Sequence, residues 1–358
     1  MPETSENQTE TPQESVDFFA KLSSETKDSM LDQSIQRLIR FNVEVLAKIL
    51  RRTLAVRNLT GTSQSEVHPY PGDASPCNAM KEVAESLTWE HDIPIIGDNE
   101  ANLPELPDIV KDQLQAFVAT LAALFNENEY HNFAHASHSV MAVNRFWNRM
   151  TRGLSTSGRR DSQRTLSEEG GESFRRLLAD PFVEFACAFA TLLKDIDHPG
   201  VDNSQLVAEG SELVAAYGVH SLSQQNAMEL AWKLFNYEGF RELRLAVCPD
   251  ASKLYRFKRI LIHAVLATDF QDEKYQQIRN DRWETAFSEC SRSNCNTTAE
   301  LRATATLETL MEASELAHKM QHWEMYVFEV DIDNAMFVTH FVCCCFISQV
   351  FGLVNKAL

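Results

Sequence analysis

The chain has 358 residues, of which 44% are hydrophobic and 23% are charged, and its formal net charge is −18. This balance is ordinary for a soluble globular protein and excludes a wholly disordered chain, a collagen and a coiled-coil rod. The acidic charge argues against a nucleic-acid partner, because phosphate contacts need clustered lysine and arginine. Residues 1–30 are polar and acidic and do not resemble a signal peptide, so the 8 cysteines are expected to be reduced thiols in a cytoplasmic protein.

The N-terminal part changes character along its length. Residues 1–30 are acidic and poor in large apolar side chains, so they predict a disordered tail. Residues 31–80 begin with a basic amphipathic helix and continue into a linker rich in glycine and proline. The helix is expected to dock on the domain or on a partner, and a position on a membrane surface is the alternative.

Residues 82–325 carry apolar side chains at mostly helical spacing, and strand-like alternation is scarce. The predicted fold class is therefore all-α. Residues 326–358 form a separate apolar segment, in which residues 336–354 approach the length of a membrane span. A buried helix, a membrane anchor that would tether the protein, and an irregular terminus remain open for this stretch.

Two motifs in the helical region carry chemically capable side chains. The sequence YHNFAHASH at 130–138 places His131 and His135 four residues apart, on one face of a helix. This pair suits a metal, or one metal ligand beside one general acid, although surface histidines show the same spacing. The sequence KDIDHPG at 194–200 ends an apolar helix with carboxylates that suit Mg²⁺ or Mn²⁺ and an imidazole that suits Zn²⁺.

Two further motifs are weak when taken alone. Thr268 lies in ATDF at 267–270, and Glu315 lies in ASELAH at 313–318, inside an apolar helical pattern. A helix cap or a solvated acid explains each one by itself. Together, in this order, the four motifs resemble the catalytic domain of class I 3′,5′-cyclic-nucleotide phosphodiesterases, most closely its algal and protist branch, over about residues 82–325.

The resemblance implies a compact multi-helix domain of the HD type, which would hydrolyse cAMP or cGMP to the 5′ monophosphate in signal transduction. It also implies two divalent metal ions, zinc and magnesium or manganese, that share a bridging hydroxide. By resemblance, the general acid is His131, the metal ligands are His135, Asp195 and Glu315, and the groups around metal-bound water are His198, Thr268 and Gln224. His131, Asp195 and Glu315 would also contact the cyclic nucleotide.

The sequence departs from the family pattern at the metal centre. Lys194 stands where the family has histidine, and an ammonium repels a dication. Glu315 replaces an aspartate and displaces the carboxylate by one methylene, which matters where geometry is tight. Gln224 replaces an acidic residue.

Residues 327–358 do not match the family segment that binds the purine, so the preference for cAMP or cGMP stays open. Three hypotheses follow for the whole chain. It is an active phosphodiesterase with an altered site, a degenerate phosphodiesterase domain that acts in binding or regulation, or a helical protein tethered to a membrane through residues 336–354.

Overall fold

The computed structural model describes residues 33–61, 79–90, 93–94, 96, 102–156, 179–287 and 295–317. The predicted disordered tail at 1–30 and the apolar segment at 336–354 lie outside these described residues. Within the described ranges every regular element is helical, which confirms the all-α prediction. Among the described helices, none combines the length and the apolar character that a membrane crossing requires.

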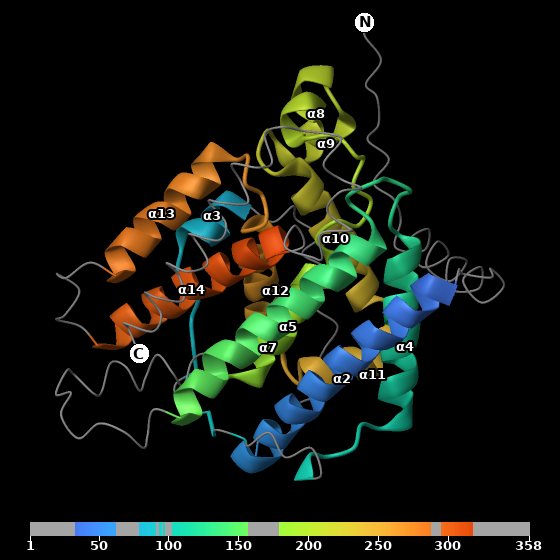
Figure 1. Cartoon of the computed structure of the whole chain (residues 1–358), viewed down its shortest axis with the longest axis vertical. Helices are drawn as coiled ribbons and strands as arrows, with labels where there is room; N and C mark the ends of the chain where they lie inside the picture. Colours follow the sequence, from blue (N-terminus) through green and yellow to red (C-terminus); the bar gives the residue numbers. More distant parts are fainter. Residues whose placement is uncertain are drawn as a thin grey trace, which may run out of the picture.

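The longest helices build the body of the domain (Figure 1). They are α2 (Gln33–Thr60), α4 (Asp108–Ala123), α5 (Phe133–Thr156), α7 (Pro181–Leu193), α10 (Leu222–Asn236), α12 (Ala251–Leu266), α13 (Glu273–Phe287) and α14 (Cys295–Ala317). Shorter elements connect them: α3 (Ala79–Ala84), α8 (Asn203–Glu209), α9 (Glu212–Tyr217), η3 (Glu238–Phe240) and α11 (Arg241–Val247).

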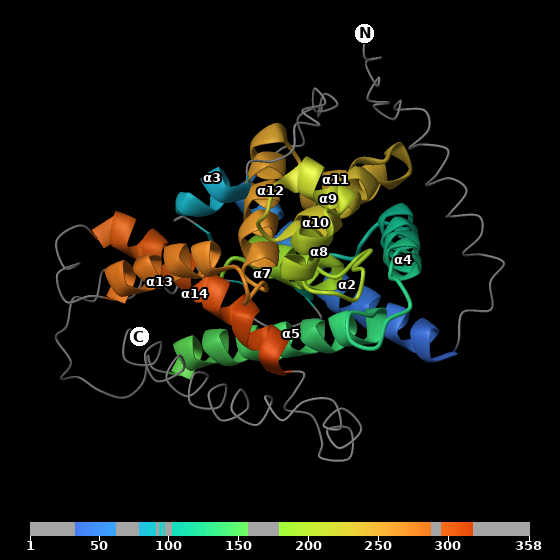
Figure 2. The same ribbon diagram turned by 90° about the horizontal axis from the view of Figure 1, so that it is seen from above.

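Helix α7 is the centre of the domain. It begins at Pro181, whose fixed φ suits the first helical position. The preceding residue, Asp180, is the N-cap, and its side chain accepts a hydrogen bond from the amide of Phe182. Every residue of α7 is buried, and all of them except Glu184 and Thr191 are apolar. Figure 2 shows α7 between α5 and α2 on one side and α12 on the other, and all three helices contact it.

Aromatic side chains fill the space around α7. The ring of Phe189 lies 5.2 Å from that of Phe117 on α4, and 5.5 Å from those of Phe235 on α10 and Phe257 on α12. Each of these rings is at most 1% exposed. The stacked and edge-on pairs add to the stabilisation from burial itself, so α7 is held firmly at the position from which its C-terminal end enters the site.

Helix α2 packs against α4, α5 and α7. Its apolar face buries Leu46 and Leu50 completely. Its basic side chains also bind the domain, because Arg52 Nη1 lies 2.6 Å from Glu184 Oε2, and Arg57 donates to carbonyl groups at the end of α11. The basic helix α2 is therefore docked on the other helices of the domain.

Candidate functional site

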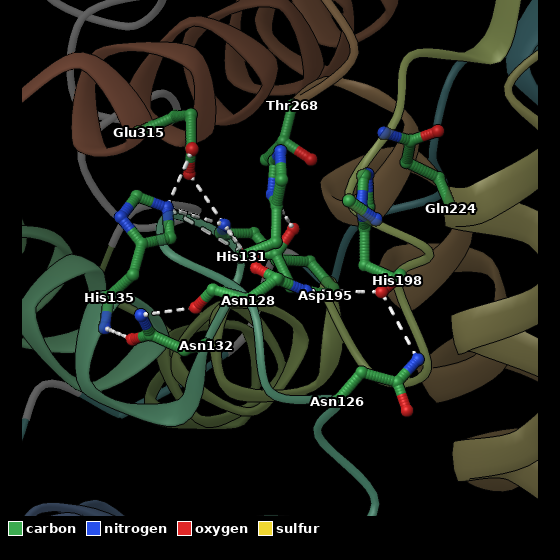
Figure 3. Close-up of polar contacts among 12 residues, drawn as sticks. Asn126, Asn128, His131, Asn132, His135, Asp195, His198, Gln224, Thr268 and Glu315 are labelled. Atoms are coloured by element: carbon green, nitrogen blue, oxygen red, sulfur yellow. Dashed lines mark hydrogen bonds and ion pairs between the residues drawn. The ribbon is translucent and has the colours of Figure 1, made fainter. Parts of the chain in front are cut away.

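The predicted general acid and metal ligands come from three segments that meet at one end of α7 (Figure 3). His135 lies in the first turn of α5, whereas His131 lies in the turn before this helix, so the two histidines do not share a helix face as expected. Lys194 and Asp195 follow the last residue of α7. Glu315 approaches from the last turn of α14. His135, Lys194, Asp195 and Glu315 are all nearly inaccessible to solvent.

The turn after α7 is fixed by the loop that follows α4. Asp197 has a φ of 55°, a left-handed conformation that aspartate tolerates better than most residues. Its amide donates to the carbonyl oxygen of Leu124 at 3.0 Å. The side-chain amides of Asn126 and Asn128 both donate to the carbonyl oxygen of His198 at 3.1 Å. These bonds orient Asp195 and His198 toward the site.

The start of α5 is fixed in a similar way. Asn132 precedes the helix, and its Oδ1 accepts a hydrogen bond from the amide of His135 at 2.9 Å. This is the geometry of a side-chain N-cap. Asn132 also donates to the carbonyl oxygen of Asn128, which ties α5 to the loop that holds the turn after α7. His135 consequently points inward and is 2% exposed.

His131 and His198 form the more open part of the site. His131 Nδ1 lies 3.0 Å from Asp195 Oδ1, and the His131 side chain is 28% exposed. The two imidazole rings stack with centroids 3.7 Å apart. Burial, together with the neighbouring His131, lowers the pKa of His198 to about 4. His198 is therefore a neutral imidazole at pH 7, and its Nδ1 accepts from the amide of Gly200 at 3.1 Å.

Lys194 occupies the centre of the cluster. Its side chain is 1% exposed. Its Nζ lies 2.7 Å from Glu315 Oε2 and 3.1 Å from His135 Nε2, and it forms an ion pair with Asp195 Oδ2. The other carboxylate oxygen of Glu315 lies 2.8 Å from His135 Nε2. The three side chains predicted as metal ligands thus converge on an ammonium group.

The pKa shifts follow from this arrangement. Burial alone would raise the pKa of Asp195 and of Glu315, because it disfavours a charged carboxylate. The Lys194 ammonium and the histidines outweigh burial, so the pKa of Asp195 falls well below its usual value and that of Glu315 falls to about 2. Burial would lower the pKa of Lys194, but the two carboxylates raise it. At neutral pH the cluster holds charged Lys194, Asp195 and Glu315.

A divalent metal does not fit the side chains present. The donor atoms of His135, Asp195 and Glu315 face the Lys194 ammonium, and a dication at that point would lie against a buried positive charge. An ammonium has no lone pair to offer a metal. Among the residues that the structure describes, no group of three or more histidine, cysteine, aspartate or glutamate side chains could hold a metal ion.

Two predicted site residues direct their hydrogen bonds elsewhere. Thr268 Oγ1 donates to the carbonyl oxygen of Val265 within its own helix end, at 2.7 Å. Gln224 Oε1 accepts from Asn203 Nδ2 at 2.8 Å, and the same amide group lies 3.0 Å from Asp269 Oδ2. The sequence motifs did not point to Asn203 or to Asn126 and Asn128 beside the turn, because single asparagines carry no periodic signal.

Part of the chain is similar in sequence to known proteins. A family model described as 3'5'-cyclic nucleotide phosphodiesterase matches residues 130–339. The probable 3',5'-cyclic-AMP phosphodiesterase pde-4 of Caenorhabditis elegans is 25% identical over 193 residues, which are 52% of this chain and 24% of that protein. The 3',5'-cyclic-nucleotide phosphodiesterase regA of Dictyostelium discoideum is 25% identical over 196 residues, 51% of this chain and 21% of regA.

The 3',5'-cyclic-AMP phosphodiesterase 4C of Mus musculus is 24% identical over 208 residues, 53% of this chain and 26% of that protein. The chain therefore spans about a quarter of the length of these relatives. Among solved structures, LmjPDEB1 in complex with IBMX matches with a TM-score of 0.44 at 20% identity, over 60% of this chain and 56% of the other. The phosphodiesterase domain of the RhoPDE fusion protein from Salpingoeca rosetta has the same TM-score at 16% identity, over 76% and 72%.

Proposed function

The chain belongs to the 3'5'-cyclic nucleotide phosphodiesterase family, and from this premise we propose that it is a catalytically degenerate member that acts in cyclic-nucleotide binding or regulation. One observation carries the proposal. The Lys194 ammonium is buried at the point where His135, Asp195 and Glu315 converge. The predicted metal ligands are thus engaged by a side chain of the protein itself.

The consequence for hydrolysis follows from the chemistry of the ammonium. In a two-metal phosphodiesterase, the bound metals supply an activated hydroxide and stabilise the charge on the phosphate. The N–H donors of Lys194 face the carboxylates of Asp195 and Glu315, and the ammonium has no lone pair with which to activate water. This side chain offers a positive charge in place of a metal but does not generate the nucleophile.

Slow hydrolysis of 3′,5′-cyclic nucleotides is the second candidate function, and His131 favours it. This side chain is partly exposed, and its Nδ1 is oriented by Asp195 at 3.0 Å. A histidine oriented by a carboxylate in this way can donate a proton to a leaving oxygen. The curated relatives are named as cyclic-nucleotide phosphodiesterases, which supports the same substrate class.

Hydrolysis of cAMP and cGMP, with Zn²⁺ and Mg²⁺ or Mn²⁺ supplied, distinguishes the two candidates. We expect the wild-type chain to be inactive, and Lys194→His, alone or with Glu315→Asp, to gain turnover because the imidazole can bind a metal. The matched control is Lys253→His, because Lys253 pairs with Glu90 on another part of the surface. It should remain inactive.

Two further measurements complete this test. Wild-type turnover that falls by ~10²-fold or more in His131→Ala would refute degeneracy and establish hydrolysis, since the substitution removes a general acid. Equilibrium dialysis with cAMP and cGMP then separates the two regulatory roles. Binding to the inactive wild type indicates a nucleotide-dependent role, and no binding indicates a role through a protein partner.

A further inference from the structure

We propose that the Lys194 ammonium is a built-in structural cation, which takes the place of a metal ion in joining α5, α7 and α14. The proposal shares its central residue with the proposed function, but it concerns the stability of the fold and not the reaction. It predicts that the folded state needs no divalent metal, and that Lys194 carries a large part of the stability of this end of the domain.

The positions of the partner side chains support a linking role. His135 belongs to α5, Glu315 belongs to the last turn of α14, and Asp195 lies in the turn after α7. Each of the three side chains is at most 7% exposed. Two buried carboxylates repel each other strongly in a medium of low dielectric constant, so a cation between them stabilises their close approach in the charged form.

The backbone brings the lysine to this point without strain. Lys194 is the C-cap residue of α7 and has ordinary helical dihedral angles, with φ of −57° and ψ of −27°. Its amide still donates to the carbonyl oxygen of Ala190 at 3.1 Å, which continues the helical pattern. The long side chain carries its charge away from the backbone and toward α5 and α14.

Each of the two carboxylate oxygens of Glu315 lies beside a nitrogen atom of a different segment. One oxygen lies 2.8 Å from His135 Nε2, and the other lies 2.7 Å from Lys194 Nζ. Glu315 therefore contacts α5 and the end of α7 at the same time. A carboxylate held by two separate partners is fixed in orientation, which is the role that a bound metal ion plays for its ligands.

The experiment is thermal unfolding of the full chain together with measurement of its metal content. After dialysis, we expect the wild type to contain far less than one zinc or magnesium ion per chain. Its Tm should be the same with EDTA, with added Zn²⁺ and with added Mg²⁺. Stoichiometric metal, or a fall in Tm on chelation, would overturn the proposal.

Variants test the lysine itself. Lys194→Met keeps an unbranched side chain but removes the charge, and it should lower Tm by roughly 10 °C because two carboxylates lose their buried partner. The control Lys253→Met removes a half-exposed ion pair with Glu90 and should lower Tm by no more than a few degrees. Equal effects of the two substitutions would refute a special role for Lys194.

A gain-of-function variant keeps the test decisive if Lys194→Met fails to fold. Lys194→His should show a Tm that rises with added Zn²⁺, since it removes the competing cation and adds a ligand. A Tm that does not respond to Zn²⁺ would contradict the idea that the ammonium occupies the position of a metal. An inactive wild type that EDTA destabilises would refute this inference alone, and an active, EDTA-resistant wild type would refute the proposed function alone.

Discussion

The pairing of Lys194 with Glu315 and Asp195 places charges of both signs where water is nearly excluded. In such a place the attraction between opposite charges is strong, and so is the cost of leaving one charge without its partner. The effects of substitutions in the cluster should therefore be large, and they should depend on which partner is removed.

Glu315→Gln tests the carboxylate side of the cluster. The substitution leaves the Lys194 charge and the His135 ring with a neutral amide, so we expect the free energy of unfolding to fall by about 3–5 kcal/mol. Denaturant-induced unfolding measures this change. Glu312→Gln, one turn earlier on the same helix, is the control. Burial raises the pKa of Glu312, so loss of its charge should change stability by less than about 1 kcal/mol. A loss of similar size in both variants would contradict the prediction.

A second buried cluster predicts a pH dependence. Glu308 on α14 lies 2.8 Å from His263 Nδ1 and forms an ion pair with Arg282. Burial would raise the pKa of Glu308, but these two partners outweigh it and lower the pKa. The stabilisation is therefore complete above the pKa of glutamate in the unfolded chain, about 4.3, and is lost as the pH falls toward the lower pKa of the folded state.

The measurement is the free energy of unfolding at a series of pH values below about 5. Wild type should lose stability more steeply than Glu308→Gln, which has no carboxylate to protonate at this position. Parallel curves for the two proteins would show that other carboxylates govern the acid response.

The site was only partly predictable at the level of single residues. The motifs predicted that His131, His135, Asp195 and Glu315 meet, and the structure brings them together. The direction of Lys194 was not predictable, because all of α7 is buried and its sequence has no polar face that would distinguish inward from outward. The roles of these residues in catalysis remain proposals.

Helix α2 shows which of its contacts the amphipathic sequence pattern predicts and which it does not. The apolar spacing predicted the buried face, but the positions of the arginines carried no information about their partners. Arg52 reaches Glu184 on α7, which is 132 residues away in the sequence. Contacts between such distant residues depend on the packing of whole helices, and periodicity within one helix does not specify them.

Arg52→Ala tests this docking. Glu184 has a side chain that is 3% exposed, so removal of the Arg52 guanidinium from this buried carboxylate should cost about 3–5 kcal/mol of unfolding free energy. Arg40→Ala is the matched control, because Arg40 lies on the exposed side of the same helix. Its effect should stay within about 0.5 kcal/mol. Equal losses, measured by denaturant unfolding, would contradict a specific role for Arg52.

At the scale of the whole molecule, one hydrophobic core joins α2 to the helices that carry the site. Leu46 and Leu50 belong to the same buried cluster as Phe117, Phe189 and Phe257. The overall helical architecture was predictable, because apolar residues recur with helical spacing through most of the domain. The order in which helices pack around α7 was not predictable, since many arrangements bury the same faces.

Leu46→Ala tests whether the domain unfolds as a unit with α2. The substitution removes a completely buried side chain and should cost about 2–5 kcal/mol. Because the core is continuous, circular dichroism and tryptophan fluorescence, to which the buried Trp147 contributes, should report the same transition midpoint in the variant. Separate midpoints would show that α2 unfolds independently, and Leu59→Ala, an exposed leucine on the same helix, should leave the midpoint unchanged.

The contact between Arg57 and the end of α11 has a consequence for synthesis on the ribosome. Arg57 Nη2 donates to the carbonyl oxygen of Ala246, 189 residues further along the chain. At an elongation rate of about 5–20 residues per second, the ribosome needs roughly 10–40 s to make the intervening segment. The C-terminal end of α2 lacks this partner throughout that interval, so the nascent chain exposes a part of α2 that the finished protein covers.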